Sequence, residues 1–152
     1  MSRTGSPTAF IGRYYHALEQ KGRLSIPALF RPAFGPTAVI TRGLDGCLFL
    51  LPLKVWDQLV QTTSRLPLTQ KRARAWVRLL ANHASLVSFD RLGRIQLPDY
   101  LRETARLRKQ VTIVGSLDRL EIWDATRYRD YLRETEAQAE TIAESLTEVH
   151  ES

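Results

Sequence analysis

The sequence predicts a mainly β fold with short helices, of the α+β class, and two observations support this prediction. The first is an internal repeat of about 45 residues, which indicates two similar units in one chain. The second is the pattern within each unit, where short β-prone runs are punctuated by glycine and interrupted by one brief helix. With 152 residues, of which 43% are apolar, the chain is long enough to bury a core and too short for a multidomain enzyme.

The repeat is clearest around two glycines. Residues 18–27 (LEQKGRLSIP) align with residues 89–98 (FDRLGRIQLP), 71 positions later, and glycine, arginine and proline recur at the same places. Farther along, Val39 aligns with Val111 and Leu48 with Leu120 at an offset of 72, which indicates one residue gained or lost. We therefore divide the chain into a first repeat (13–55), a helical connector (56–83), a second repeat (84–127) and an acidic C-terminal helix or tail (128–152).

Each repeat is expected to contribute three longer strands joined by tight turns. Gly22 and Gly93 fit the first turn of each repeat, because glycine reaches positive φ without a Cβ penalty. Each of these turns presents the arginine that follows the glycine. The β-prone runs are residues 10–18, 38–41, 47–51, 86–89, 111–114 and 120–123.

A proline precedes the brief helix of each repeat. Pro27 and Pro98 fit the first helical position, where a missing N–H is harmless. After Pro98 we expect a helix over residues 99 to about 107. After Pro27 we expect little more than one turn, because Pro32 disfavours helix at Arg31.

Helices are also expected outside the repeats. Apolar spacing predicts two in the connector, where Lys71, Arg74 and Arg78 share one stripe that is either a solvated face or a rail for phosphates. Residues 126–149 predict another helix, with apolar Ile142, Leu146 and Val149. Glutamates recur there every fourth residue from 136 to 148, and such like charges repel. This helix therefore docks on a basic surface of this or a neighbouring subunit, or forms a solubilising tail.

The charges are segregated along the chain. Residues 1–133 hold all 22 basic side chains and ten of the 16 acidic ones, a net charge of +12, while residues 134–152 hold the other six acids. Eighteen of the basic residues are arginines, whose planar group suits phosphate and guanine, so a polyanionic partner is expected. A single cysteine, the polar first seven residues and the lack of a long apolar run favour a soluble cytosolic protein over a secreted or membrane protein.

The motifs of the two repeats resemble a known family. Residues 21–27 (KGRLSIP) and 90–98 (DRLGRIQLP) resemble the SpoVT-AbrB signature, and two copies in one chain are similar to the MraZ family of transcriptional regulators. Residues 46–53 (GCLFLLPL), 82–84 (NHA) and 120–124 (LEIWD) also match that family's pattern.

The resemblance implies a pseudo-twofold, swapped-hairpin β-barrel that assembles into a ring-like homo-oligomer. It also implies a cytoplasmic, nucleoid-associated repressor that binds direct repeats of double-stranded DNA upstream of the division and cell wall gene cluster.

The resemblance also gives expectations for individual residues. Arg23 and Arg94 are expected to contact guanine edges, while Arg13, Lys21 and Arg91 contact phosphates. Six residues are assigned to the structural motif that holds the turns: Glu19, Gly22, Pro27, Asp90, Gly93 and Pro98. Glu19 departs from the aspartate usual in the family, and we expect it to pair with Arg23 as Asp90 pairs with Arg94.

Other functional classes fit these residues less well. An enzyme is disfavoured because His16, His83 and His150 lack metal-ligand spacing, and Cys47 lies in an apolar run with no base beside it. We expect no cofactor, metal, small-molecule substrate or membrane partner. Two alternatives stay open: an antitoxin-like AbrB module that binds a protein partner together with DNA, and a non-specific nucleoid-associated protein.

Overall fold

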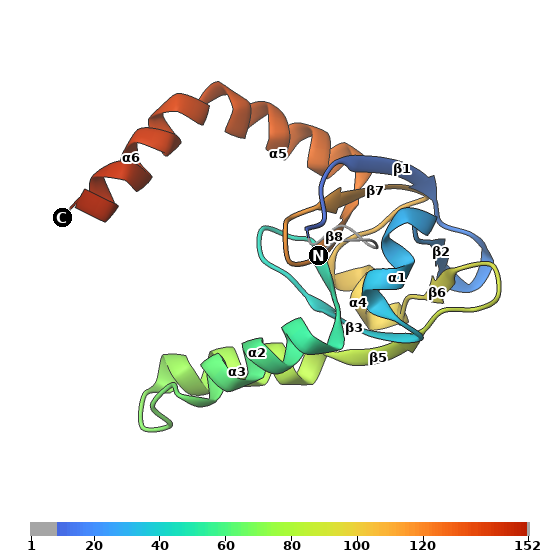
Figure 1. Ribbon diagram of the computed structural model, residues 1–152, viewed down its shortest axis with the longest axis horizontal. Helices are drawn as coiled ribbons and strands as arrows, with labels where there is room; N and C mark the ends of the chain where they lie inside the picture. The colour runs from blue at the N-terminus through green and yellow to red at the C-terminus, as the bar shows by residue number, and fades with distance from the viewer. Residues whose placement is uncertain (1–8, 152) are drawn as a thin grey trace, which may run out of the picture.

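Antiparallel strands form the centre of the protein, and two helical arms project from it (Figure 1). The computed structural model describes the backbone of residues 9–151 and the side chains of residues 9–147, so the polar start and the side chains of Val149 and His150 lie outside it. The strands are β1 (Arg13–Ala17), β2 (Arg23–Ser25), β3 (Thr37–Arg42), β4 (Leu48–Leu51), β5 (Ser85–Ser88), β6 (Arg94–Gln96), β7 (Gln110–Gly115) and β8 (Leu120–Asp124). The helices are η1 (Gln20–Gly22), η2 (Ala28–Phe30), α1 (Arg31–Phe34), α2 (Leu53–Ser64), α3 (Lys71–His83), α4 (Asp99–Thr104), α5 (Ala125–Ala137) and α6 (Ala139–Glu151).

The sheet topology confirms that the two repeats exchange strands. Six strands lie in the order β1-β7-β8-β4-β3-β5, so the first strand of each repeat pairs with the other repeat. β2 and β6 pair with each other as a separate two-stranded ribbon, which lies between the two edges of the six-stranded sheet (Figure 1). The α+β class is therefore confirmed, and the barrel-like arrangement consists of a sheet and a ribbon.

Strand registers locate the pseudo-twofold axis. In the ribbon Leu24 lies opposite Ile95, its own equivalent in the other repeat. In the six-stranded sheet Phe49 lies opposite Glu121, which is again its equivalent. The axis therefore passes through both pairs, and each repeat completes the sheet of the other.

The registers correct one detail of the sequence alignment. Val39 pairs with Leu51, and Thr112 pairs with Trp123, the equivalent of Leu51. Val39 is therefore equivalent to Thr112, an offset of 73, and not to Val111. Two residues were gained before β7, and one was lost in the hairpin after it, where residues 116–119 replace the longer loop 43–47. The sequence alignment missed this because both offsets match apolar residues.

The brief helices differ from the expectation at their ends. Pro27 and Pro98 are the residues before η2 and α4, one position outside the predicted place. Pro32 does not stop the first helix. It lies in the first turn of α1, where proline is tolerated, and Arg31 is helical. α4 ends at Thr104, short of the predicted residue 107, and Arg106 follows with a left-handed φ of 51°.

The core lies between the six-stranded sheet, the ribbon and the brief helices, and it draws equivalent residues from both repeats. Leu24, Ile95, Phe30 and Leu101 are at most 1% exposed. Such burial of apolar side chains is the main favourable contribution to folding. Cys47 is buried in the apolar strand region, and burial raises the pKa of its thiol, which disfavours the thiolate form.

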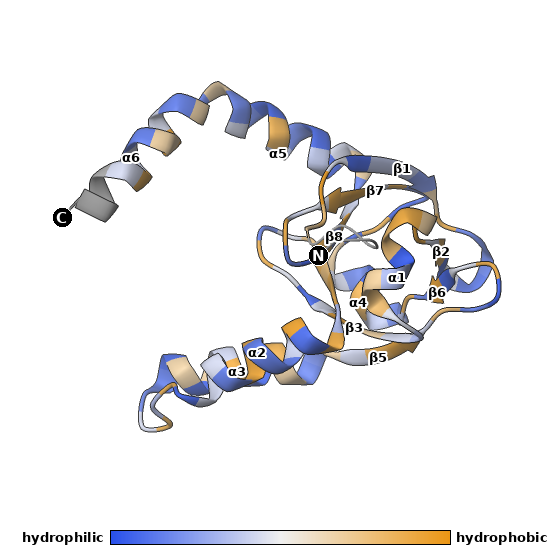
Figure 2. Ribbon diagram, in the orientation of Figure 1, coloured by the Kyte–Doolittle hydropathy of each residue, from blue (hydrophilic) through white to orange (hydrophobic). Residues whose placement is uncertain are grey.

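Two arms extend from this core on one side (Figures 1 and 2). α2 and α3 form a helical hairpin, which confirms the two connector helices. The other arm is α5 followed by α6, and a break at Gln138 divides what the sequence predicts as one helix. The buried Asp124 carboxylate starts this arm, because it accepts hydrogen bonds from the amide of Arg127 and from Arg108. No helix within the described residues is long and apolar enough to cross a membrane.

Candidate nucleic-acid interface

Two equivalent turns carry the predicted site at one end of the molecule. Turn 1 (residues 19–23) leads into β2, and turn 2 (residues 90–94) leads into β6. In both, the first residue donates its amide hydrogen to the carbonyl of the fifth, at 2.9 Å, and the glycine amide donates back to the first. Gly22 and Gly93 have φ of 72° and 77°, so the prediction that glycine makes these turns is confirmed.

Asp90 holds turn 2 from within. Its Oδ1 accepts hydrogen bonds from the amides of Leu92 and Arg94, both at 2.9 Å, and its Oδ2 accepts one from Arg94 Nε at 2.8 Å. The expected Asp90–Arg94 pair is thus confirmed. The Arg94 amide and, next to it, the Arg94 side chain and Leu92 amide hold the pKa of the Asp90 carboxyl below its ordinary value. The Asp90 carboxylate is therefore ionised at neutral pH and holds turn 2 as a charged acceptor.

Glu19 acts across the pseudo-twofold axis instead of within its own turn. Its Oε1 accepts a hydrogen bond from Arg94 Nη1 at 3.0 Å, and its Oε2 accepts one from the Ser25 hydroxyl. The expectation that Glu19 pairs with Arg23 is wrong. The extra methylene relative to aspartate carries the carboxylate past the amides of turn 1 to Arg94, which lies directly opposite Ser25 in the ribbon.

Arg94 is consequently held by two carboxylates. Its side chain is only 19% exposed, and the hydrogen bonds to Asp90 and then to Glu19 raise the pKa of its guanidinium above the ordinary value. No ion pair of this kind involves Arg23 among the described residues, although its side chain is only partly exposed. The two equivalent arginines therefore have different environments.

Each turn is also supported by an arginine from the other repeat. Arg102 packs against Gly22, where an added Cβ would lie 2.6 Å from its Nε, and Arg31 packs against Gly93 in the same way. Arg31 Nε donates to the carbonyl of Ile26, and Arg102 pairs with Asp99. Both arginines therefore have structural contacts within the fold. Glycine is therefore required at both positions, because the φ is positive and because the arginine leaves no space for a Cβ atom.

The predicted cations do not all come together. Lys21 and Arg91 are exposed on turns 1 and 2. Arg13 is at the far end of β1, about 13 Å along the strand from Ala17, in a hollow beside Tyr128 and Arg129. The expected strand over residues 10–18 already implies this separation, because an extended chain rises about 3.3 Å per residue.

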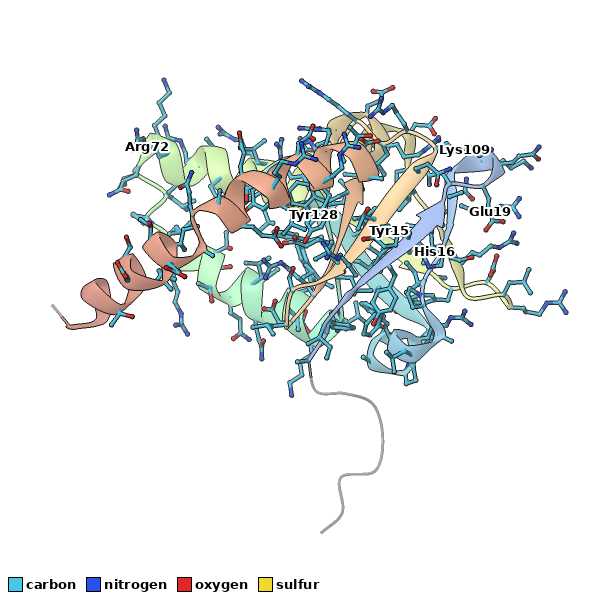
Figure 3. All side chains as sticks on the ribbon, turned by 90° about the horizontal axis from the view of Figure 1, so that it is seen from above. Tyr15, His16, Glu19, Arg72, Lys109 and Tyr128 are labelled. Atoms are coloured by element: carbon cyan, nitrogen blue, oxygen red, sulfur yellow. The ribbon has the colours of Figure 1, made fainter. Side chains whose placement is uncertain are left out.

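Lys109 is a cation of the site that the sequence did not reveal. It lines the same hollow as Arg23, Arg94 and Glu19, and the Leu18 amide donates to its carbonyl at 2.7 Å. Figure 3 shows Lys109 beside Glu19, while Arg72 of the helical hairpin lies at the opposite end of the molecule. The strand exchange brings Lys109 here, and Pro36 occupies the equivalent place at turn 2.

Neither histidine of the described part forms a site of another kind. His16 is half-buried on β1, and His83 Nδ1 is 2.8 Å from the carbonyl oxygen of Leu79. Within residues 9–147, no three histidine, cysteine or acidic side chains gather as a metal ion would require. Within the described residues, turns 1 and 2 are therefore the best candidate for a binding site, and their exposed cations suit an anionic partner.

Comparisons with known proteins agree with the repeat. The family model of the MraZ protein, which is described as antitoxin-like, matches residues 9–79 and again residues 80–149. The chain is 47% identical to the transcriptional regulator MraZ of Moorella thermoacetica over 139 residues, covering 91% of this chain and 97% of that protein. It is 42% identical to that of Halothermothrix orenii, covering 92% and 98%, and 46% identical to that of Lactiplantibacillus plantarum, covering 90% and 97%.

Proposed function

Because this chain belongs to the MraZ family, we propose that it is a transcriptional regulator that binds DNA sequence-specifically through turns 1 and 2. It acts as a repressor at direct repeats upstream of the division and cell wall gene cluster, in the cytoplasm and on the nucleoid. We assign it no catalytic activity. The observation that carries the proposal is the pair of turns related by the pseudo-twofold axis, held by hydrogen bonds at the two ends of a short two-stranded ribbon.

The geometry suits the major groove of DNA. A two-stranded ribbon is narrow enough to enter it, so no recognition helix is needed. Arg23 is placed to contact a guanine edge, with Arg94 at the base of turn 2. Lys21, Arg91 and Lys109 contact phosphates and fix the position of the protein without specifying sequence. We keep Arg13 as a phosphate contact outside the turns.

A binding assay with matched charge loss tests this function. The probe is a fluorescent duplex with two direct repeats, selected with the full-length protein from a random-sequence pool. The variant Lys21→Ala, Arg23→Ala, Arg91→Ala removes two phosphate contacts and one guanine contact and should weaken binding at least a hundredfold at low salt. The control Arg42→Ala, Lys54→Ala, Arg106→Asn loses three cations outside the turns and outside the segments 56–83 and 128–152, and it should bind within a few-fold of wild type. Asparagine is used at 106 because it tolerates the left-handed φ of that position. Equal losses in both triple variants would refute the assignment.

The same assay separates the two alternatives. A non-specific nucleoid-associated protein would yield no preferred sequence, and its affinity would be indifferent to the repeats. An antitoxin-like module would carry a bound protein that is lost when the chain is truncated after Arg133. We expect a preferred repeat, and DNA binding without any second protein.

We further propose a ring-like homo-oligomer, formed by the connector (56–83) and the acidic C-terminal segment (128–152). One weak contact per subunit becomes strong binding when a ring meets several repeats. α6 has no packed face in the single chain: its residues 139–147 are all exposed, including Ile142 at 40% and Leu146 at 60%. A helix of this length is marginal in water without a partner. Trp56, Val60 and Val77 line an apolar groove between α2 and α3 that suits such a stripe.

Native mass measurement tests the assembly. Ile142→Asp with Leu146→Asp should give a smaller species than wild type. The control Thr141→Asp with Ser145→Asp adds the same charges on other faces of α6 and should keep the native mass. An unchanged mass for the first variant would contradict the role of α6.

A further inference from the structure

Turns 1 and 2 share the same backbone hydrogen bonds, but they differ at the tip, where Lys21 has a left-handed φ of 63° and Leu92 does not, and they present different side chains. At the tip, Lys21 of turn 1 corresponds to Leu92 of turn 2, which is 67% exposed. Beside the turn, Lys109 corresponds to Pro36. The outward chemistry of turn 1 is therefore cationic, whereas turn 2 presents an apolar tip next to the single exposed cation Arg91.

Arg23 and Arg94 also differ in how freely their side chains can move toward a base. Moving Arg94 toward a base would break its hydrogen bonds to Asp90 and Glu19, of 2.8 Å and 3.0 Å. It would also leave two carboxylates unpaired beside the phosphates of DNA, which is unfavourable. In the ribbon Arg23 lies opposite uncharged Gln96, so it can turn to a base without leaving a carboxylate behind.

We propose that the two turns recognise different bases, an inference that rests on the proposed DNA-binding function. Turn 1 recognises guanine through the guanidinium of Arg23. Turn 2 recognises thymine through contact of Leu92 with its methyl group. Arg94 is a positioning residue that joins the two turns through Glu19 and Asp90.

The chemistry of the major groove supports this division. Arginine recognises guanine by its O6 and N7 acceptors, and an apolar side chain recognises thymine by the C5 methyl group. An exposed leucine at the tip of a turn that faces DNA has no phosphate to bind, and the thymine methyl is the apolar group that this groove offers it. One chain would then select a guanine and a thymine at a fixed separation.

Base analogues test each contact separately. In the selected duplex, each guanine is replaced in turn by 7-deazaguanine, which lacks N7, and each thymine by uracil, which lacks the methyl group. For wild type we expect about fivefold weaker binding at one guanine per repeat and about fourfold at one thymine. Arg23→Ala should lose only the guanine effect, and Leu92→Ala only the thymine effect.

Two further variants make the inference falsifiable. Arg94→Lys should weaken binding to every duplex while both analogue effects persist. Leu44→Ala, on an exposed hairpin leucine of the first repeat, should behave as wild type. The inference is overturned if Leu92→Ala keeps the thymine effect, or if Arg94→Lys loses the guanine effect. Binding without any sequence preference would refute the proposed function itself, and this inference with it.

Discussion

The contact between Gly93 and Arg31 allows a quantitative test of how the repeats hold each other's turns. In Gly93→Ala, the φ of 77° would place alanine in the left-handed region, at a cost of about 1–2 kcal/mol. The new Cβ would displace the Arg31 guanidinium and break its hydrogen bond to Ile26, which costs about 1 kcal/mol. Alanine also restricts the unfolded chain more than glycine does, which offsets about 0.5 kcal/mol of this loss. We expect a net loss of about 2 kcal/mol in unfolding free energy.

Urea unfolding followed by tryptophan fluorescence measures this change, because Trp123 is buried in the fold. A thermal scan should show a Tm lower by about 6 °C. The same substitution in an Arg31→Ala background should cost about 1 kcal/mol less, because no guanidinium is displaced there. An equal cost in both backgrounds would refute the contact between the repeats, and a cost near zero would refute the backbone argument as well.

Three other outcomes are expected. Asp124→Ala removes the cap of α5 and a buried acceptor, so urea unfolding should show a loss of about 2 kcal/mol; a loss below 0.5 kcal/mol would contradict this. Burial raises the pKa of Asp124, but hydrogen bonds from Arg108 and Arg127 outweigh it and hold the pKa below its ordinary 3.8. The contribution of the Asp124 carboxylate to stability is therefore fully present above pH 4 and is lost as the pH drops further. The Tm of Asp124→Asn should consequently decline less on acidification than the Tm of wild type. Glu19→Gln keeps an acceptor for Arg94 in its amide oxygen but removes a negative charge beside turn 1, so it should strengthen binding to any duplex about threefold at low salt, an effect that should vanish at high salt.

The sequence predicts the repeated parts of this fold well because they obey local rules. Gly22 and Gly93 recur at positions that need positive φ, and the strand runs carry β-branched and aromatic residues. The exchange of strands between repeats came from the family resemblance, since local patterns do not specify which strands pair. The single break at Gln138 has no proline or glycine to mark it.

The candidate site was predictable only in part, because several of its contacts cross the pseudo-twofold axis. Asp90 and Arg94 are four residues apart, so their pairing is a local feature. Glu19 and Arg94 are separated by 75 residues, and only the ribbon register brings them together. Lys109 likewise reaches turn 1 through the pairing of β1 with β7. Sequence spacing contains no signal for such contacts. Arg13 is a different case: it was grouped with the turns because it is near them in sequence, although the strand that separates it from turn 1 is extended.

Hydrogen–deuterium exchange of the full-length protein, with and without the selected duplex, tests the central claim most directly. If the turns bind DNA, amides of residues 19–25 and 90–96 should exchange more slowly in the complex, while the hairpins at 43–47 and 116–119 remain unchanged. Protection confined to the α2–α3 hairpin, with both turns exchanging as in the free protein, would contradict the account.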